Sequence, residues 1–160
     1  MEYGHKIIYS IDIGAKGAMS VFKNDRYIKT LEYSSIDEWH DEIYWSIREV
    51  GRDNIIIVIE KVHAMPKQGV VSMFNFGRKL GEVEAMCKIL KIEPIYVSPR
   101  EWKSYFNMIG SHKNFSCIKA LELEPKLKCY GKKGGCLDGI ADSYLIGRYF
   151  IENKLIRKYK

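Results

Sequence analysis

The apolar positions in the first fifth of the chain predict three consecutive strands. Between residues 7 and 13, apolar and other side chains alternate, so that Ser10 and Asp12 share one face and a mostly apolar row lies on the other. Gly14 and Gly17 permit a tight turn into a second strand over residues 18–22. A turn at residues 24–25 then leads into a weaker strand over 27–33. Three strands in succession indicate an antiparallel meander.

The remaining pattern alternates helices with buried strands. Residues 36–50 have helical spacing behind a Ser35/Glu38 capping box, and residues 55–59 form an unbroken β-branched run that ends at Glu60. Apolar periodicity then predicts helices over 76–90, from the Ser98-Pro99 start, over 116–123 and over 137–153, with a short strand at 95–97. Without internal repeats or a visible boundary, the order predicts one α/β domain over residues 1–160.

Four carboxylates stand at the edges of these predicted elements. Asp12 interrupts the first strand, Glu60 ends the central strand, and Asp138 and Asp142 lie four residues apart on one face of the last helix. Burying an unpaired carboxylate costs several kcal/mol, so Asp12 requires a cation, a cluster of donors or an open cleft. Taken singly, each acid also has an ordinary explanation as a turn acceptor, a helix cap or a solvated charge.

Carboxylates without histidine or thiolate partners suit Mg²⁺ or Mn²⁺ and not zinc. Two such ions about 4 Å apart can activate water and neutralise the leaving oxygen of a phosphodiester. Taken together, the four acids therefore suggest a metal-dependent nuclease.

Composition agrees with a polyanionic partner. The 160 residues include 26 Lys and Arg against 20 Asp and Glu, for a formal charge of +6 and a pI near 9.0, although a charge that serves only solubility fits equally. No apolar run approaches the ~20 residues needed to cross a bilayer, and the N-terminus lacks a signal-peptide pattern. We therefore expect an intracellular, cytoplasmic protein without a membrane partner.

The four cysteines have irregular spacing and form no CxxC pair, which predicts reduced thiols. The alternative is a zinc site at Cys129 and Cys136 with a nearby histidine, but two further regularly spaced ligands are missing.

The sequence around the acids resembles the RuvC-type Holliday junction resolvases of the RNase H-like superfamily, most closely the phage-type or organellar branch. The resemblance is carried by IDIGAKGA around Asp12, VIEKVHAM around Glu60, and LDGIADSYLIGRY around Asp138 and Asp142. It spans nearly the whole chain. Two departures stand out: the last two acids are four residues apart where many bacterial members have three, and His63 occupies the region of an aromatic wedge.

The resemblance implies an RNase H-like fold with a mixed five-stranded sheet, an antiparallel meander plus parallel strands, flanked by helices. It implies a homodimer that binds four-way DNA junctions and nicks two opposing strands, leaving 5′-phosphate and 3′-hydroxyl ends, in DNA recombination and repair. It also implies that the four acids hold two Mg²⁺ ions, with Mn²⁺ as a substitute.

Further site residues follow from the same resemblance. Gly77 and Gly81 match a glycine pair in the family's dimer helix, and Phe74 is a candidate for the same interface, for the junction or for the core. SPREWK and GSHK resemble the segment with the DNA-contacting lysines, here Lys103 and Lys113. His63 either stacks on DNA or is a satisfied loop histidine, and Lys132 and Lys133 either track phosphates or belong to a solvated loop.

Two rival functions remain at the level of the sequence. One is a catalytically weak junction-binding protein of the same fold. The other is an actin- or hexokinase-like ATPase domain, because IDIGAKGA also resembles that superfamily's phosphate-binding hairpin, although the chain offers no second glycine-rich loop.

Overall fold

The computed structural model describes residues 6–61, 69–112 and 114–155. Its five strands form one sheet in the order β3-β2-β1-β4-β5. The strands are β1 (Ile7–Asp12), β2 (Ala18–Lys23), β3 (Arg26–Glu32), β4 (Ile55–Glu60) and β5 (Ile95–Val97). β1 to β3 form an antiparallel meander, whereas β1, β4 and β5 run parallel. The predicted mixed sheet is therefore confirmed, and β1 lies at its centre.

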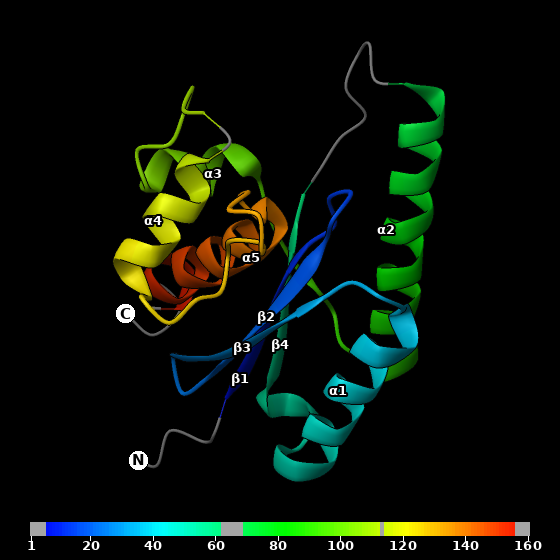
Figure 1. Cartoon of the computed structure of the whole chain (residues 1–160). Helices are drawn as coiled ribbons and strands as arrows, with labels where there is room; N and C mark the ends of the chain where they lie inside the picture. Colours follow the sequence, from blue (N-terminus) through cyan, green and yellow to red (C-terminus); the bar gives the residue numbers. More distant parts are fainter. Residues whose placement is uncertain (1–5, 62–68, 113, 156–160) are drawn as a thin grey trace.

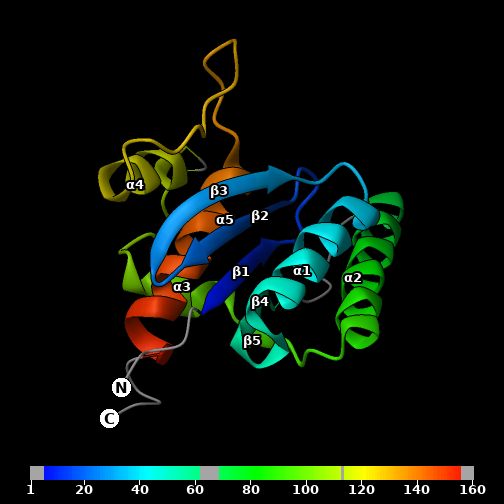
Figure 2. The same ribbon diagram turned by 90° about the horizontal axis from the view of Figure 1, so that it is seen from below.

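Helices cover both faces of the sheet (Figures 1 and 2). α1 (Ile36–Val50) and α2 (Val70–Leu90) lie on one face. α5 (Asp138–Tyr149) packs on the other with α3 (Pro99–Tyr105) and α4 (Phe115–Leu123) beside it. Two shorter turns, η1 (Arg52–Asn54) and η2 (Phe150–Leu155), precede β4 and extend α5. No helix in the described ranges is long and apolar enough to span a membrane.

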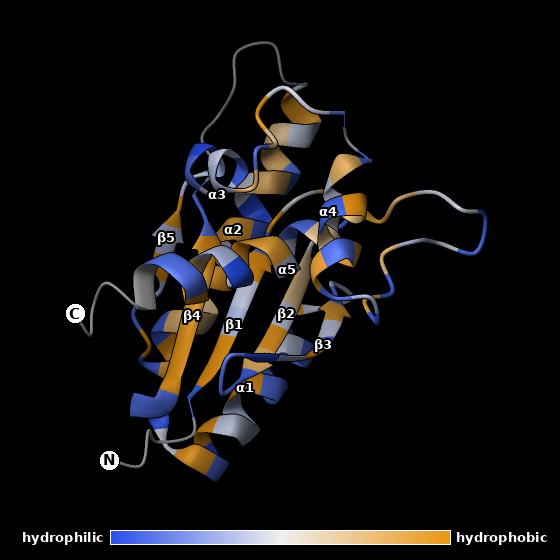
Figure 3. Cartoon of the chain, turned by 90° about the vertical axis from the view of Figure 1, so that its left-hand side faces the viewer, coloured by the Kyte–Doolittle hydropathy of each residue, from blue (hydrophilic) through white to orange (hydrophobic). Residues whose placement is uncertain are grey.

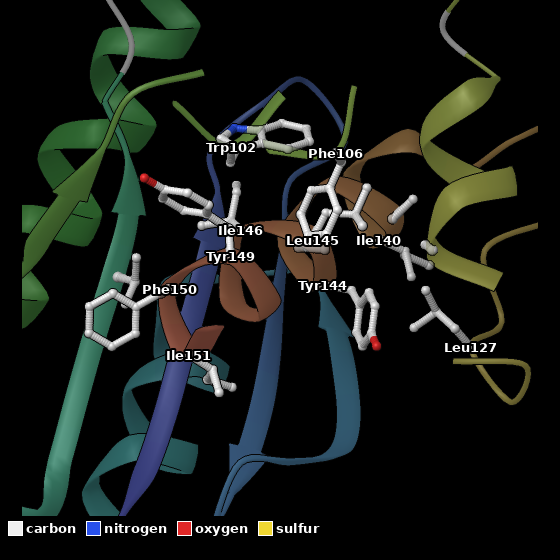
Figure 4. Close-up of a cluster of buried hydrophobic side chains, with 14 of the residues drawn as sticks. Trp102, Phe106, Leu127, Ile140, Tyr144, Leu145, Ile146, Tyr149, Phe150 and Ile151 are labelled. Atoms are coloured by element: carbon white, nitrogen blue, oxygen red, sulfur yellow. The ribbon is translucent and has the colours of Figure 1, made fainter. Parts of the chain in front are cut away.

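Both faces of β1 are buried, and its alternate side chains point into two separate hydrophobic clusters, one on each side of the sheet. The row that includes Tyr9 and Ile11 packs with Trp39 of α1 and Val83 of α2. The opposite row, which begins at Ile8, faces the cluster around α5 that Figure 4 shows, with Trp102, Leu145 and Ile146 among its members. Ser10 and Asp12 belong to that second row, so they are buried polar groups that face α5.

The expectation of four reduced thiols is wrong for two of them. Cys117 of α4 and Cys136 form a disulfide with a Cα–Cα distance of 6.1 Å, whereas Cys87 and Cys129 are free and buried. The spacing of 19 residues carries no signal in the sequence, since the fold alone brings α4 against the segment that leads into α5. The zinc alternative fails with it, because the Cys136 sulfur is no longer a free thiolate.

The segment over residues 124–137 joins α4 to α5; Leu127 and Cys129 are buried in the core, and the part beyond Cys129 projects from the body with a hydrophilic tip (Figure 3). Its base is closed by a hydrogen bond from the Leu137 N–H to the Cys129 carbonyl, at 2.8 Å, and by a bridge between Tyr130 and Cys136. The projecting tip carries Lys132 and Lys133, both exposed.

Candidate active site

Parallel pairing brings the first two predicted acids together. Asp12 ends β1 and Glu60 ends β4, and these neighbouring strands run in the same direction with Ile11 opposite Ile59. The carboxyl ends of parallel strands lie at one edge of a sheet. Both side chains are almost fully buried, at 7% and 9% exposure. Their charges would therefore interact in a poorly solvated space.

α5 adds the other two acids. Asp138 is its first residue and Asp142 lies one turn later, and both line a pocket of about 480 Å³ together with Asp12 and the turn residues 14–16. The carboxylate charges of Glu60, Asp142 and Asp138 all act on Asp12. The structure thus brings together all four acids that the sequence singled out.

Burial raises the pKa values of three of these acids, and repulsion between carboxylates adds to the rise for Asp12 and Asp142. Desolvation raises the pKa of Asp12 well above its usual value, with Glu60 and Asp142 adding to the effect and the Gly14 N–H opposing it. Burial raises the pKa of Asp142 to about 6, against a hydrogen bond from Ser116. Burial also raises the pKa of Glu60, against its hydrogen bond from Trp102 and the nearby Lys103 charge. A cation in the pocket would reverse this balance and favour all the charged forms.

The residues present fit a divalent cation by the nature of their donors. All four are carboxylates, and Asp142 Oδ1 is buried without a hydrogen-bond partner among the described residues. An orphaned carboxylate oxygen that faces like charges is stabilised by a metal ion. As placed, however, no three acidic, cysteine or histidine side chains in the described residues surround a common point for an ion. Binding would therefore require the carboxylates to draw together.

Two of the acids are held from outside the cluster. The Trp102 indole N–H donates to Glu60 Oε1 at 2.9 Å in a buried contact, and the Gly14 N–H donates to Asp12 Oδ1 at 3.1 Å. Trp102 is itself fully buried, and the capping box that starts α3 sets its position. These donors orient the carboxylates, because a carboxylate oxygen accepts such bonds along defined directions.

A second pocket, of about 240 Å³, adjoins the first at Asp138 and Asp142. It is lined by Lys103, Ser111 and His112, among others. The Lys103 ammonium lies 5.1 Å from the centre of the Trp102 ring. The two pockets share Asp138 and Asp142; the first extends to the β1–β2 turn and the second to Lys103 of α3.

The close approach of α5 to the sheet was not predicted. A Cβ atom at Gly139 would lie 1.9 Å from the Lys16 carbonyl oxygen, and one at Gly147 would lie 2.3 Å from Phe22 Cε2. Between them, Ser143 accepts a hydrogen bond from Ser10 Oγ through its carbonyl oxygen, at 2.7 Å. Its hydroxyl lies 2.8 Å from that of Ser20. The signal was present in the sequence, since small residues recur every fourth position at 139, 143 and 147.

The other predicted site residues are dispersed. Lys103 lines the second pocket, but Lys132 and Lys133 lie on the projecting segment and line neither pocket. Gly77, Gly81 and Phe74 lie on α2, on the opposite side of the sheet from α5. His63 and Lys113 lie outside the described residues. Lys79 of α2, for which the sequence carries no functional signal, reaches the turn beside Asp12.

Comparison with solved structures identifies the fold. The structure is similar to Thermus thermophilus RuvC in complex with a Holliday junction substrate, with a TM-score of 0.64 at 10% sequence identity over 94% of this chain and 96% of that one. A second structure of Thermus thermophilus RuvC gives 0.57 at 13% identity, with the same coverage of both chains.

The yeast mitochondrial Holliday junction resolvase Ydc2 gives a TM-score of 0.59 at 14% identity, over 98% of this chain and 84% of that one. No protein-family model matches the sequence, and no curated protein is significantly similar to it. The fold is therefore that of the RuvC-type resolvases, as the resemblance implied.

Proposed function

We propose that this protein is a metal-dependent, structure-selective endodeoxyribonuclease that resolves four-way DNA junctions by paired symmetric nicks. The observation that carries the proposal is the gathering of four carboxylates in a RuvC-type fold: Asp12, Asp138 and Asp142 line one pocket, and the charge of the buried Glu60 acts on Asp12. Burying like charges is costly unless a cation is bound there, which a site for DNA binding alone would not require.

In this proposal Asp12, Glu60, Asp138 and Asp142 hold two Mg²⁺ ions, for which Mn²⁺ substitutes. When bound, such ions activate a water for in-line attack on phosphorus and neutralise the leaving oxygen. The chain's own donors prepare the site, since the Trp102 and Gly14 N–H groups hold Glu60 and Asp12 before any metal arrives. Residues 1–160 form one nuclease domain in this proposal.

Basic residues position the DNA. Lys103 borders the pocket shared by Asp138 and Asp142, where a scissile phosphate would meet its ammonium. Lys132 and Lys133 on the projecting segment, together with Lys113 and His63, contact the junction arms in this proposal. Each phosphate contact releases counterions, so binding should weaken steeply with salt.

Paired nicks require two sites, which a homodimer through α2 would supply. The N-terminal turns of α2 extend beyond the β1–β2 turn (Figure 1), and Val70, Val71 and Phe74 there are 84%, 74% and 70% exposed. A methyl group at Gly77 or Gly81 would meet no described atom within 4 Å, so this helix face is open to close packing by a second helix. In the proposal, sedimentation shows a dimer for the wild type and a monomer for Phe74→Asp.

The decisive experiment is cleavage of a synthetic four-way junction in Mg²⁺, with the nick positions mapped. Wild type should nick two opposing strands symmetrically, and Asp12→Asn and Glu60→Gln should lose cleavage while still binding the junction in EDTA. Asp53→Asn is the matched control, because Asp53 is exposed in η1. Junction binding without any cutting by the wild type would refute the nuclease and leave the junction-binding alternative.

A further inference from the structure

The β1–β2 turn is a structural part of the candidate site. It follows Asp12 directly, its residues 14–16 line the pocket, and the Lys16 carbonyl oxygen lies against Gly139 of α5. Because Ala15 and Lys16 are exposed, the turn has no hydrophobic packing of its own at its tip. Polar contacts therefore add to the packing of its buried ends, Ile13 and Ala18, in fixing its position and with it the gap between Asp12 and the acids of α5.

One ammonium supplies such contacts from the other side of the sheet. Lys79 Nζ donates to the Gly14 carbonyl oxygen at 2.9 Å and to the Ala15 carbonyl oxygen at 3.3 Å. It also lies 4.5 Å from the centre of the Tyr33 ring. Hydrogen bonds from a charged donor are roughly twice as strong as neutral ones, and an aromatic face adds a further attraction.

Tyr33 ties the far end of the turn to the same helix. Its backbone N–H donates to the Gly17 carbonyl oxygen at 2.8 Å, and its hydroxyl donates to Glu82 of α2. Lys79 and Tyr33 therefore anchor the turn to α2 at both ends. Burial lowers the pKa of Lys79 while the Asp12 charge raises it, so the ammonium is partly withdrawn from water toward the site.

We propose that Lys79 is a positioning residue that clamps the β1–β2 turn against α2 and so holds Asp12 at its working distance from Asp138 and Asp142. The effect of Lys79 on catalysis rests on the proposed nuclease function, whereas its ordering of the β1–β2 turn does not. A lysine that only lends positive charge to a DNA surface would instead act on junction affinity. A lysine that positions the turn should affect kcat, the rate at which bound junction is cleaved.

The test compares Lys79→Met with Lys79→Arg and with Lys88→Met, an exposed lysine on the same helix. For Lys79→Met we expect kcat for junction cleavage to fall by about 10- to 100-fold, the loss typical of misplacing a catalytic group by about 1 Å. The KM for the junction should hardly change, and the Mg²⁺ concentration for half-maximal rate should rise. Lys79→Arg should recover most of the rate, and Lys88→Met should match wild type.

A second measurement does not depend on cleavage. The ¹⁵N order parameters of the residue 14–17 amides should fall from about 0.85 toward 0.6 in Lys79→Met and stay unchanged in Lys88→Met. If the wild type cuts no junction, the proposed nuclease function is wrong, but these order parameters still test whether Lys79 holds the turn in place. Unchanged order parameters in Lys79→Met, or an effect on KM alone, would overturn the clamp.

Discussion

Replacing Gly139 by alanine should separate stability from activity more sharply than any change to the acids. The new methyl would lie 1.9 Å from the Lys16 carbonyl oxygen and 3.0 Å from its carbon, whereas ordinary contacts begin near 3.4 Å. Because the opposing atoms belong to the backbone, a rotamer change cannot relieve the overlap. The turn and the N-terminus of α5 must separate by more than about 1 Å.

The two consequences differ in size. Overpacking costs about 1 to 3 kcal/mol, but alanine in a helix returns up to about 1 kcal/mol relative to glycine. The net loss of unfolding free energy should therefore be about 0 to 2 kcal/mol. The same displacement moves Asp138 and Asp142 away from Asp12, and about 1 Å of misplacement costs about 100-fold in rate. The expected result is a variant that is almost as stable as the wild type but has little cleavage activity.

The matched comparison is Gly147→Ala, two turns further along the same helix. Its methyl would lie 2.3 Å from Phe22 Cε2 and 2.6 Å from Ser10 Oγ, so it strains the core beneath the helix and leaves the turn alone. With the same return from alanine in a helix, it should lose about 0 to 2 kcal/mol of stability and keep most of its kcat. Urea unfolding and single-turnover junction cleavage below the unfolding midpoint measure both quantities. The reasoning is refuted if Gly139→Ala cleaves like wild type, or if both variants lose activity in proportion to stability.

Three further predictions follow from the site and its surroundings. The pKa of Asp142 in the folded, metal-free protein is raised to about 6, so between about pH 4 and 6 the folded protein keeps a proton that the unfolded chain releases. The unfolding free energy, measured by urea titration, should therefore fall by up to about 3 kcal/mol as the pH rises from about 4 to 6. Asp142→Asn should reduce this pH dependence. Reduction of the Cys117–Cys136 disulfide should cost about 3 kcal/mol for a loop of this length, which a Cys117→Ser/Cys136→Ser variant should show without reductant. Replacing Lys132 and Lys133 by alanine should weaken junction binding and reduce the slope of log K against log salt by about 2, while kcat at saturating junction stays unchanged.

The sequence was informative where the periodicity was strong. The alternation in β1 and the β-branched run of β4 predicted the buried pair of strands, and the acids at their ends predicted the site. These local patterns carry a physical requirement, since an acid within an apolar strand must find a partner.

Some contacts between residues far apart in the chain could not be predicted from the sequence. The disulfide joins cysteines 19 residues apart, and the Lys79 ammonium meets carbonyls 65 and 64 residues earlier in the chain. A lysine on an amphipathic helix looks the same in sequence whether it faces water or a turn. Only the packing of α2 against the sheet distinguishes the two.

The stripe of small residues on α5 bears on how variation in related chains should be interpreted. Gly139, Ser143 and Gly147 would tolerate little change because α5 lies so close to the sheet and the β1–β2 turn, and not because they touch a substrate. A survey of natural variants would place them beside Asp138 and Asp142 among the least changeable positions of the helix. Such a survey would show both groups as nearly invariant, although the small residues are constrained by packing and the acids by chemistry. Only the size of the side chains tolerated at each position would distinguish the two constraints.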